Sequence, residues 1–70
     1  MRPNPTTHSV KITINEEANY KIVNLNGKVF QKGILFSGDN EIIVSHLLKG
    51  LYFLSIKTDK GFINKKLLKL

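Results

Sequence analysis

The 70-residue sequence has no cysteine, few acidic residues and no long apolar run. Without cysteine the chain has no disulfide, no thiolate metal ligand and no cysteine nucleophile, and its redox compartment stays undetermined. The apolar stretches are only a few residues long, so no segment is long enough to span a bilayer. The first residues lack the apolar core of a signal peptide, and we expect any such signal to lie upstream on a longer precursor.

Acidic residues are outnumbered, with five Asp and Glu against eleven Lys and Arg and a formal net charge of +6. This charge favours anionic partners such as phosphates, anionic lipid or an acidic protein surface without choosing among them. Hydrophobic residues make up 41% of the chain and charged residues 23%, a balance typical of a folded module. A chain this short buries only roughly 60% of its unfolded surface, so we expect one domain with a small core.

Alternation of apolar and polar residues predicts a series of short strands rather than helices. The expected strands cover residues 9–14, 20–25, 28–35, 40–44, 51–58 and the terminal segment after the Asp59-Lys60-Gly61 turn. Residues 45–49 are too few for a stable helix and predict one helical turn or a tight loop ending at Gly50. Six strands joined by Gly, Asn and Asp turns indicate an all-β fold, a small antiparallel β-sandwich or barrel.

Glycine and proline predict the connections. Asn26-Gly27 predicts a hairpin with a type I′ turn, in which both central residues need a positive φ. Gly33 interrupts the following strand and predicts a bulge or bend there. The two prolines of Pro3-Asn4-Pro5 favour extended backbone, so we expect residues 1–7 to form an extended linker end and residues 8–70 the folded domain.

The terminal segment is a strand with imperfect alternation. Nine residues after Gly61 are too few to hold a helix in water, and we expect them to pair with residues 51–58. The apolar residues fall on both parities: Ile63 and Leu67 on one, and Phe62, Leu68 and Leu70 on the other. A bulge near Lys65-Lys66, or cover on both faces, is needed to reconcile them.

No pattern in the chain predicts catalysis or metal binding. Ser45 and His46 are neighbours in extended chain and point to opposite faces, with no third member of a triad in view. Glu16-Glu17 are paired in sequence only, and so short a chain has little material for a cleft. The remaining titratable candidates, which lack metal-ligand spacing, are His8, His46, Asp39 and Glu41. We expect no enzyme activity, no cofactor and no metal.

Nucleic-acid binding is the alternative that composition leaves open. Small basic β domains combine lysines with aromatic rings that stack on bases, and four Phe and two Tyr are present. However, Lys11, Lys21 and Lys57 interleave with apolar residues as the solvent side of strands, which also protects β proteins from aggregation. A free-standing adhesive β module is a further alternative.

Five blocks of the chain carry a resemblance to a known family. They are Pro3-Asn4-Pro5, Val10-Lys11-Ile12-Thr13-Ile14, Asn24-Leu25-Asn26-Gly27, Leu47-Leu48-Lys49-Gly50-Leu51-Tyr52 and Lys65-Lys66-Leu67-Leu68-Lys69. In their order and spacing, from residue 3 to residue 70, they resemble the type A C-terminal sorting domain of the bacterial type IX secretion system. That resemblance implies an immunoglobulin-like β-sandwich of about seven short strands.

The resemblance also implies a non-enzymatic address. Such a domain follows an N-terminal cargo domain in one precursor, which a signal peptide takes to the periplasm of bacteria of the Bacteroidetes type. An outer-membrane translocon recognises the domain, and a sortase usually removes it, so that the cargo is secreted or held at the cell surface. The implied partners are translocon, sortase and cargo, with no nucleic acid and no transmembrane segment. We therefore expect this chain to be an excised piece of a longer protein.

The resemblance assigns roles to particular residues. Lys65, Lys66 and Lys69 are the candidates for partner recognition, because ammonium groups on a terminal strand would steer toward an acidic partner. Pairing along a strand edge is an alternative mode of recognition. Gly50 is expected in a backbone conformation closed to side chains, and Tyr52 is expected to pack inward with its hydroxyl hydrogen-bonded. The motif residues with structural roles are Pro3, Asn4, Pro5, Gly27, Leu47, Gly50 and Tyr52.

Overall fold

The computed structural model describes residues 4–6 and 8–70, and this part of the chain contains strands and turns but no helix. The strands are β1 (Asn4–Thr6), β2 (Ser9–Ile14), β3 (Ala18–Val23), β4 (Val29–Leu35), β5 (Gly38–Ile43), β6 (Gly50–Thr58) and β7 (Gly61–Lys69). The predicted all-β class is confirmed.

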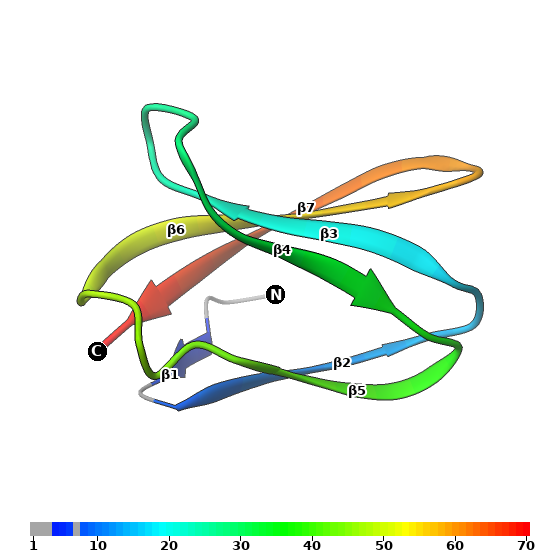
Figure 1. Ribbon diagram of the computed structural model, residues 1–70, viewed down its shortest axis with the longest axis horizontal. Helices are drawn as coiled ribbons and strands as arrows, with labels where there is room; N and C mark the ends of the chain where they lie inside the picture. Colours follow the sequence, from blue (N-terminus) through cyan, green and yellow to red (C-terminus); the bar gives the residue numbers. More distant parts are fainter. Residues whose placement is uncertain (1–3, 7) are drawn as a thin grey trace.

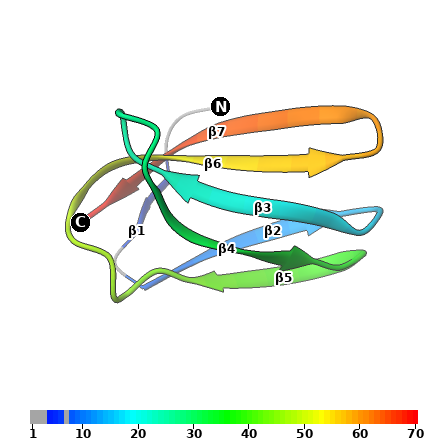
Figure 2. The same cartoon turned by 45° about the horizontal axis from the view of Figure 1, so that its top comes forward.

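The strands form two facing sheets. The larger sheet has the order β1-β7-β6-β3-β4, and the smaller one pairs β2 with β5. Figure 1 shows β2 and β5 together on one side of the larger sheet, and Figure 2 shows β7, β6, β3 and β4 side by side. All pairs among β2 to β7 are antiparallel, whereas β1 joins β7 in parallel. This arrangement is compatible with the expected immunoglobulin-like sandwich of six to seven strands.

Alternation located the strands well. The strand predicted at residues 9–14 is β2, and the one predicted at 51–58 is β6 with Gly50 added. The strands predicted at 20–25 and 40–44 both begin two residues earlier than expected, and each ends before the expected residue. For residues 45–49 the sequence predicted either one helical turn or a tight loop, and the structure has the tight loop. In it the Leu47 N–H donates to the Val44 carbonyl at 3.0 Å.

A single apolar core lies between the sheets. In β6 the inward residues are Tyr52, Leu54 and Ile56. The rest of the core comes from both sheets and the β5–β6 loop: Val10, Ile12, Ala18, Ile22, Leu35, Ile42, Val44, Leu47 and Leu67. Burial of these side chains is the main driving force for folding, at about 25 cal/mol per Å² of apolar surface.

The hairpin at Asn26-Gly27 is present, but the predicted type I′ turn is wrong. The Gly27 N–H donates to the Asn24 carbonyl at 3.0 Å, and the Asn24 N–H donates to the Lys28 carbonyl at 3.1 Å. Gly27 has φ +83°, and no described residue other than glycine has a positive φ. The loop is therefore the three-residue kind, with glycine at its left-handed position. Asn24 holds it, because its Oδ1 accepts the Asn26 and Lys28 N–H groups at 2.9 Å each.

Gly33 does not mark the bulge in β4. The shift in pairing with β3 comes after Ile22 and leaves Phe30 as the extra residue of β4, three positions before the glycine. Gly33 lies opposite Tyr20, and a Cβ atom at position 33 would be 2.7 Å from Tyr20 Cε2. The glycine therefore leaves room for the aromatic ring.

The terminal segment pairs with β6 as predicted, but without a bulge. The register runs unbroken from Thr58 opposite Gly61 to Gly50 opposite Lys69. The apolar residues on the two faces of this strand have different environments. Leu67 enters the core, while Phe62 on the opposite face remains 65% exposed. A sandwich of two sheets this small buries only the inner face of each sheet, so Phe62 on the outer face stays exposed.

The expected linker end contributes a strand. Asn4 lies opposite Leu67 and Thr6 opposite Lys69, so β1 extends the larger sheet beyond β7. Pro3, the first motif residue, lies outside the described residues, whereas Asn4 and Pro5 belong to β1. The boundary between an extended linker at 1–7 and a domain at 8–70 stays a prediction.

Candidate recognition site

The structure separates the three lysines that the sequence assigned to recognition. Lys66 is exposed on the outer face of the larger sheet, the face turned away from β2 and β5. Lys65 and Lys69 share the parity of the core residue Leu67, and Lys65 is half-buried. Lys69 is only 7% exposed, and its Nζ donates to the carbonyl of Leu70 at 3.1 Å. These three residues therefore do not form one exposed patch.

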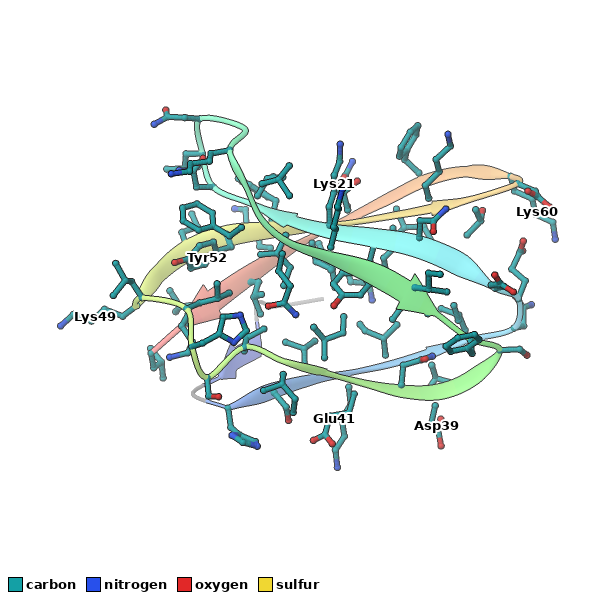
Figure 3. The ribbon with its side chains drawn as sticks, viewed as in Figure 1. Lys21, Asp39, Glu41, Lys49, Tyr52 and Lys60 are labelled. Carbon is teal, nitrogen blue, oxygen red and sulfur yellow. The ribbon has the colours of Figure 1, made fainter. Side chains whose placement is uncertain are left out.

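Lys66 instead shares its face with lysines from three other strands. Lys21 on β3 lies directly opposite Lys32 on β4, and on its other side Lys21 lies opposite Ser55 of β6, two residues from Lys57. All of these lysines are exposed. We call this set the lysine face: Lys21, Lys32, Lys57 and Lys66. Figure 3 shows Lys21 pointing away from the smaller sheet.

Acidic residues lie elsewhere in the molecule. The strands of the larger sheet contain no Asp or Glu. Asp39 and Glu41 are on β5, where they accept hydrogen bonds from Thr13 at 2.8 Å and Ser9 at 2.7 Å. Figure 3 shows both carboxylates on the side opposite to Lys21. The sandwich thus has a cationic outer face on one sheet and its strand-borne carboxylates on the other.

Exposed apolar side chains share the outer face of the larger sheet with the lysines. An open groove crosses this face, and its lining includes Lys21, Lys32, Lys57, Ile34 and Phe62. Both apolar members of this set are exposed, and the Lys57 Nζ lies 5.8 Å from the centroid of the Phe62 ring. A cation over the face of an aromatic ring is attracted to it electrostatically.

Of the lysine face, only Lys66 was predicted from the sequence as a recognition residue. Alternation placed Lys21 and Lys57 on the solvent side of their strands, which is the signal that points each one outward. Their connection to Lys66 and Lys32 could not be predicted, because alternation along a strand carries no information about which strands become neighbours. The pairing of β3 with β4 and β6, together with the pairing of β6 with β7, makes that connection.

The motif around Gly50 and Tyr52 builds the end of the core. Leu47 is buried, and Tyr52 is 6% exposed, with its hydroxyl donating to the Leu48 carbonyl at 2.6 Å. The Phe30 ring meets the Tyr52 ring edge-on, with centroids 5.6 Å apart. Gly50 has φ +151°, a conformation that side chains rarely adopt. The inward packing expected for Tyr52 is found.

Tyr52→Phe should destabilise the domain by about 1 kcal/mol, because the Leu48 carbonyl loses its donor. For a domain of this size such a loss lowers Tm by about 4–8 °C. Urea unfolding of the purified domain measures the difference. The matched control is Tyr20→Phe, for which we expect a smaller loss, because Gln31 Nε2 also donates to the Ile43 carbonyl at 3.1 Å. Equal stability of Tyr52→Phe and the parent would contradict the assigned role.

The described residues contain no group of three or more His, Cys, Asp or Glu side chains positioned to hold a metal ion. Ser45 and His46 are exposed in the loop after β5. Glu16 makes an ion pair with Lys60 at 3.9 Å between two turns. In this same part of the chain we found no helix with the length and apolar character that a membrane crossing requires.

Comparison with known proteins identifies the family. Searches of the curated proteins and of the solved structures each found no match. The model of a family described as the secretion system C-terminal sorting domain matches residues 1–70, the whole chain. That family is a sorting signal of the type IX secretion system rather than a catalytic family, and the match lends nothing to the nucleic-acid alternative. The chain therefore belongs to the type IX secretion system C-terminal sorting domains and is a sorting signal of that system.

Proposed function

We propose that this domain directs an N-terminal cargo protein through the outer-membrane translocon of the type IX system. A signal peptide on the precursor first takes the cargo to the periplasm. A sortase then removes the domain, and the cargo is secreted or retained at the cell surface. The observation that carries this proposal is the family match over residues 1–70. Attachment to a type IX cargo also implies a secreted or cell-surface protein.

The burial and backbone conformation of the motif residues support recognition of the folded domain. Leu47 and Tyr52 are buried, and Gly50 has a positive φ, so these residues serve packing and chain direction. Side chains inside the core do not meet a partner directly. A receptor that recognises the folded domain therefore contacts exposed residues, which the buried motif residues hold in position.

Among the lysines first assigned to recognition, Lys66 has the most favourable position. It is exposed, whereas Lys69 is buried and Lys65 is half-buried. Replacing all three lysines with Gln would impair export, but the effect at Lys69 would include a change in packing. Lys66→Gln isolates the charge, because exposed charges contribute little to stability.

Export of a reporter tests the proposed function. Residues 1–70 are fused to the C-terminus of a reporter carrying a signal peptide and a linker, in a host with a type IX system. We expect reporter in the medium or on the cell surface, measured as a fraction of the total. The controls are the same reporter without residues 1–70 and a host strain lacking the translocon. Accumulation of the complete fusion in the periplasm would refute the sorting function.

A further inference from the structure

We infer that the lysine face is a docking surface for an acidic protein surface of the type IX machinery. This inference rests on the proposed function and specifies which part of the folded domain the machinery contacts. It replaces the terminal lysines as a group with Lys21, Lys32, Lys57 and Lys66, which come from four different strands.

Charge is the first argument for an acidic partner. None of the lysines of this face forms an ion pair with a described residue, and the strands of their sheet carry no acidic residue. Lys21 and Lys32 are directly opposite one another, an arrangement of like charges that is unfavourable within the domain itself. A partner that supplies carboxylates here relieves this repulsion and gains attraction.

Exposed apolar surface is the second argument. Lysines alone would make the face soluble, but Val29, Ile34, Leu51 and Phe62 are also exposed on it. Apolar side chains on a surface contribute to affinity when a partner covers them, at about 25 cal/mol per Å². Apolar contacts surrounded by charged residues are typical of protein–protein interfaces.

The shape and chemistry of the face favour a protein over a nucleic acid or a membrane. Among the exposed apolar side chains of the face, Val29, Ile34 and Leu51 are aliphatic and the Phe62 ring has the Lys57 ammonium over it, which leaves few rings open for stacking bases. The groove over this face would also leave a gap against a flat bilayer. A protruding acidic element of a protein fills that groove and contacts Lys21, Lys32 and Lys57, which line it.

Two charge variants of the reporter fusion test this inference. The face variant changes Lys21, Lys32, Lys57 and Lys66 to Gln. The control variant changes the same number of exposed lysines elsewhere to Gln, at Lys11, Lys28, Lys49 and Lys60. Both lose the same net charge. We expect the exported fraction to fall at least about tenfold in the face variant and to stay within about twofold in the control, since four contacts of modest strength combine.

A third variant separates loss of recognition from loss of folding. Replacing the same four residues of the face with Arg retains the charge and should retain export within about threefold, since an ammonium and a guanidinium both attract carboxylates. Thermal melting of the purified domains checks that all three variants fold. Export lost equally in the Arg and Gln variants, with both folded, would overturn an electrostatic role.

The outcomes for the proposed function and the docking surface are distinguishable. If the parent fusion is not exported, the sorting function fails. If the parent is exported and the face and control variants match each other, the docking surface is wrong. The purified parent is also mixed with vesicles of phosphatidylcholine and phosphatidylglycerol and with single-stranded DNA. If the parent and the control variant bind vesicles or DNA and the face variant does not, the surface is assigned to lipid or to nucleic acid. That outcome would overturn the protein partner.

Discussion

Leu54→Ala should remove a large share of the stability of the domain. Leu54 is 2% exposed in the middle of β6, opposite Ile22 of β3 and Lys65 of β7. Truncating a buried leucine to alanine costs about 2–5 kcal/mol, because apolar contacts are lost and a cavity remains. A chain of 70 residues is expected to have an unfolding free energy of about 4–10 kcal/mol in total.

Urea unfolding followed by circular dichroism measures this loss. The matched control is Leu48→Ala, because Leu48 is 82% exposed and its truncation should change the unfolding free energy by less than about 0.5 kcal/mol. A similar midpoint for the two variants, with unchanged dependence on urea, would contradict the assignment of Leu54 to the core.

The same pair of variants tests whether the sorting signal is a surface of the folded domain. Leu54→Ala leaves every residue of the lysine face and of the terminal segment intact. If the machinery recognises the folded domain, the exported fraction of the reporter should fall together with the folded fraction, while Leu48→Ala should be exported like the parent. Export of unfolded Leu54→Ala at the parental rate would show that a linear segment is sufficient.

Gly50→Ala should give the second largest loss of stability, through the backbone alone. A Cβ atom at position 50 would meet nothing within 4 Å, so no clash contributes. The φ of +151° is the cause, since holding a non-glycine residue in such a region costs about 1–3 kcal/mol. Alanine also has fewer conformations than glycine in the unfolded chain, which favours the folded state. This gain offsets only part of the cost of the positive φ.

Thermal and urea unfolding measure the effect at Gly50, with Lys49→Ala as the control. Lys49 is the exposed neighbour of Gly50, and its φ is not positive, so alanine there should change stability by less than about 0.5 kcal/mol. A Gly50→Ala variant as stable as the parent would mean that the loop can adopt another path into β6.

Local chemistry allowed much of the fold to be predicted. Alternation of Val10 and Ile12 with polar residues identified β2, because successive side chains of a strand point to opposite faces. Gly27 marked a hairpin through its tolerance of positive φ, although the turn type was wrong because Asn24 supplied acceptors that the Asn-Gly pattern does not specify. The bulge was also misplaced, since it depends on pairing between β3 and β4.

The terminal segment shows why the candidate site was only partly predictable. Sequence identified a basic strand that returns along β6, and this pairing is confirmed. Whether a lysine on that strand is buried or exposed depends on what lies against each face. Lys69 is buried and Lys66 is exposed, although both belong to the same basic run.

The sequence by itself determined the all-β class, the approximate places of the strands and the family. These follow from side-chain alternation, from glycines at turns and from motifs that each depend on residues close together in the chain. Only the tertiary structure decided which lysines share a surface. Lys21, Lys32, Lys57 and Lys66 share one face because β7, β6, β3 and β4 pair in that order, and lateral order results from long-range pairing that no local pattern specifies.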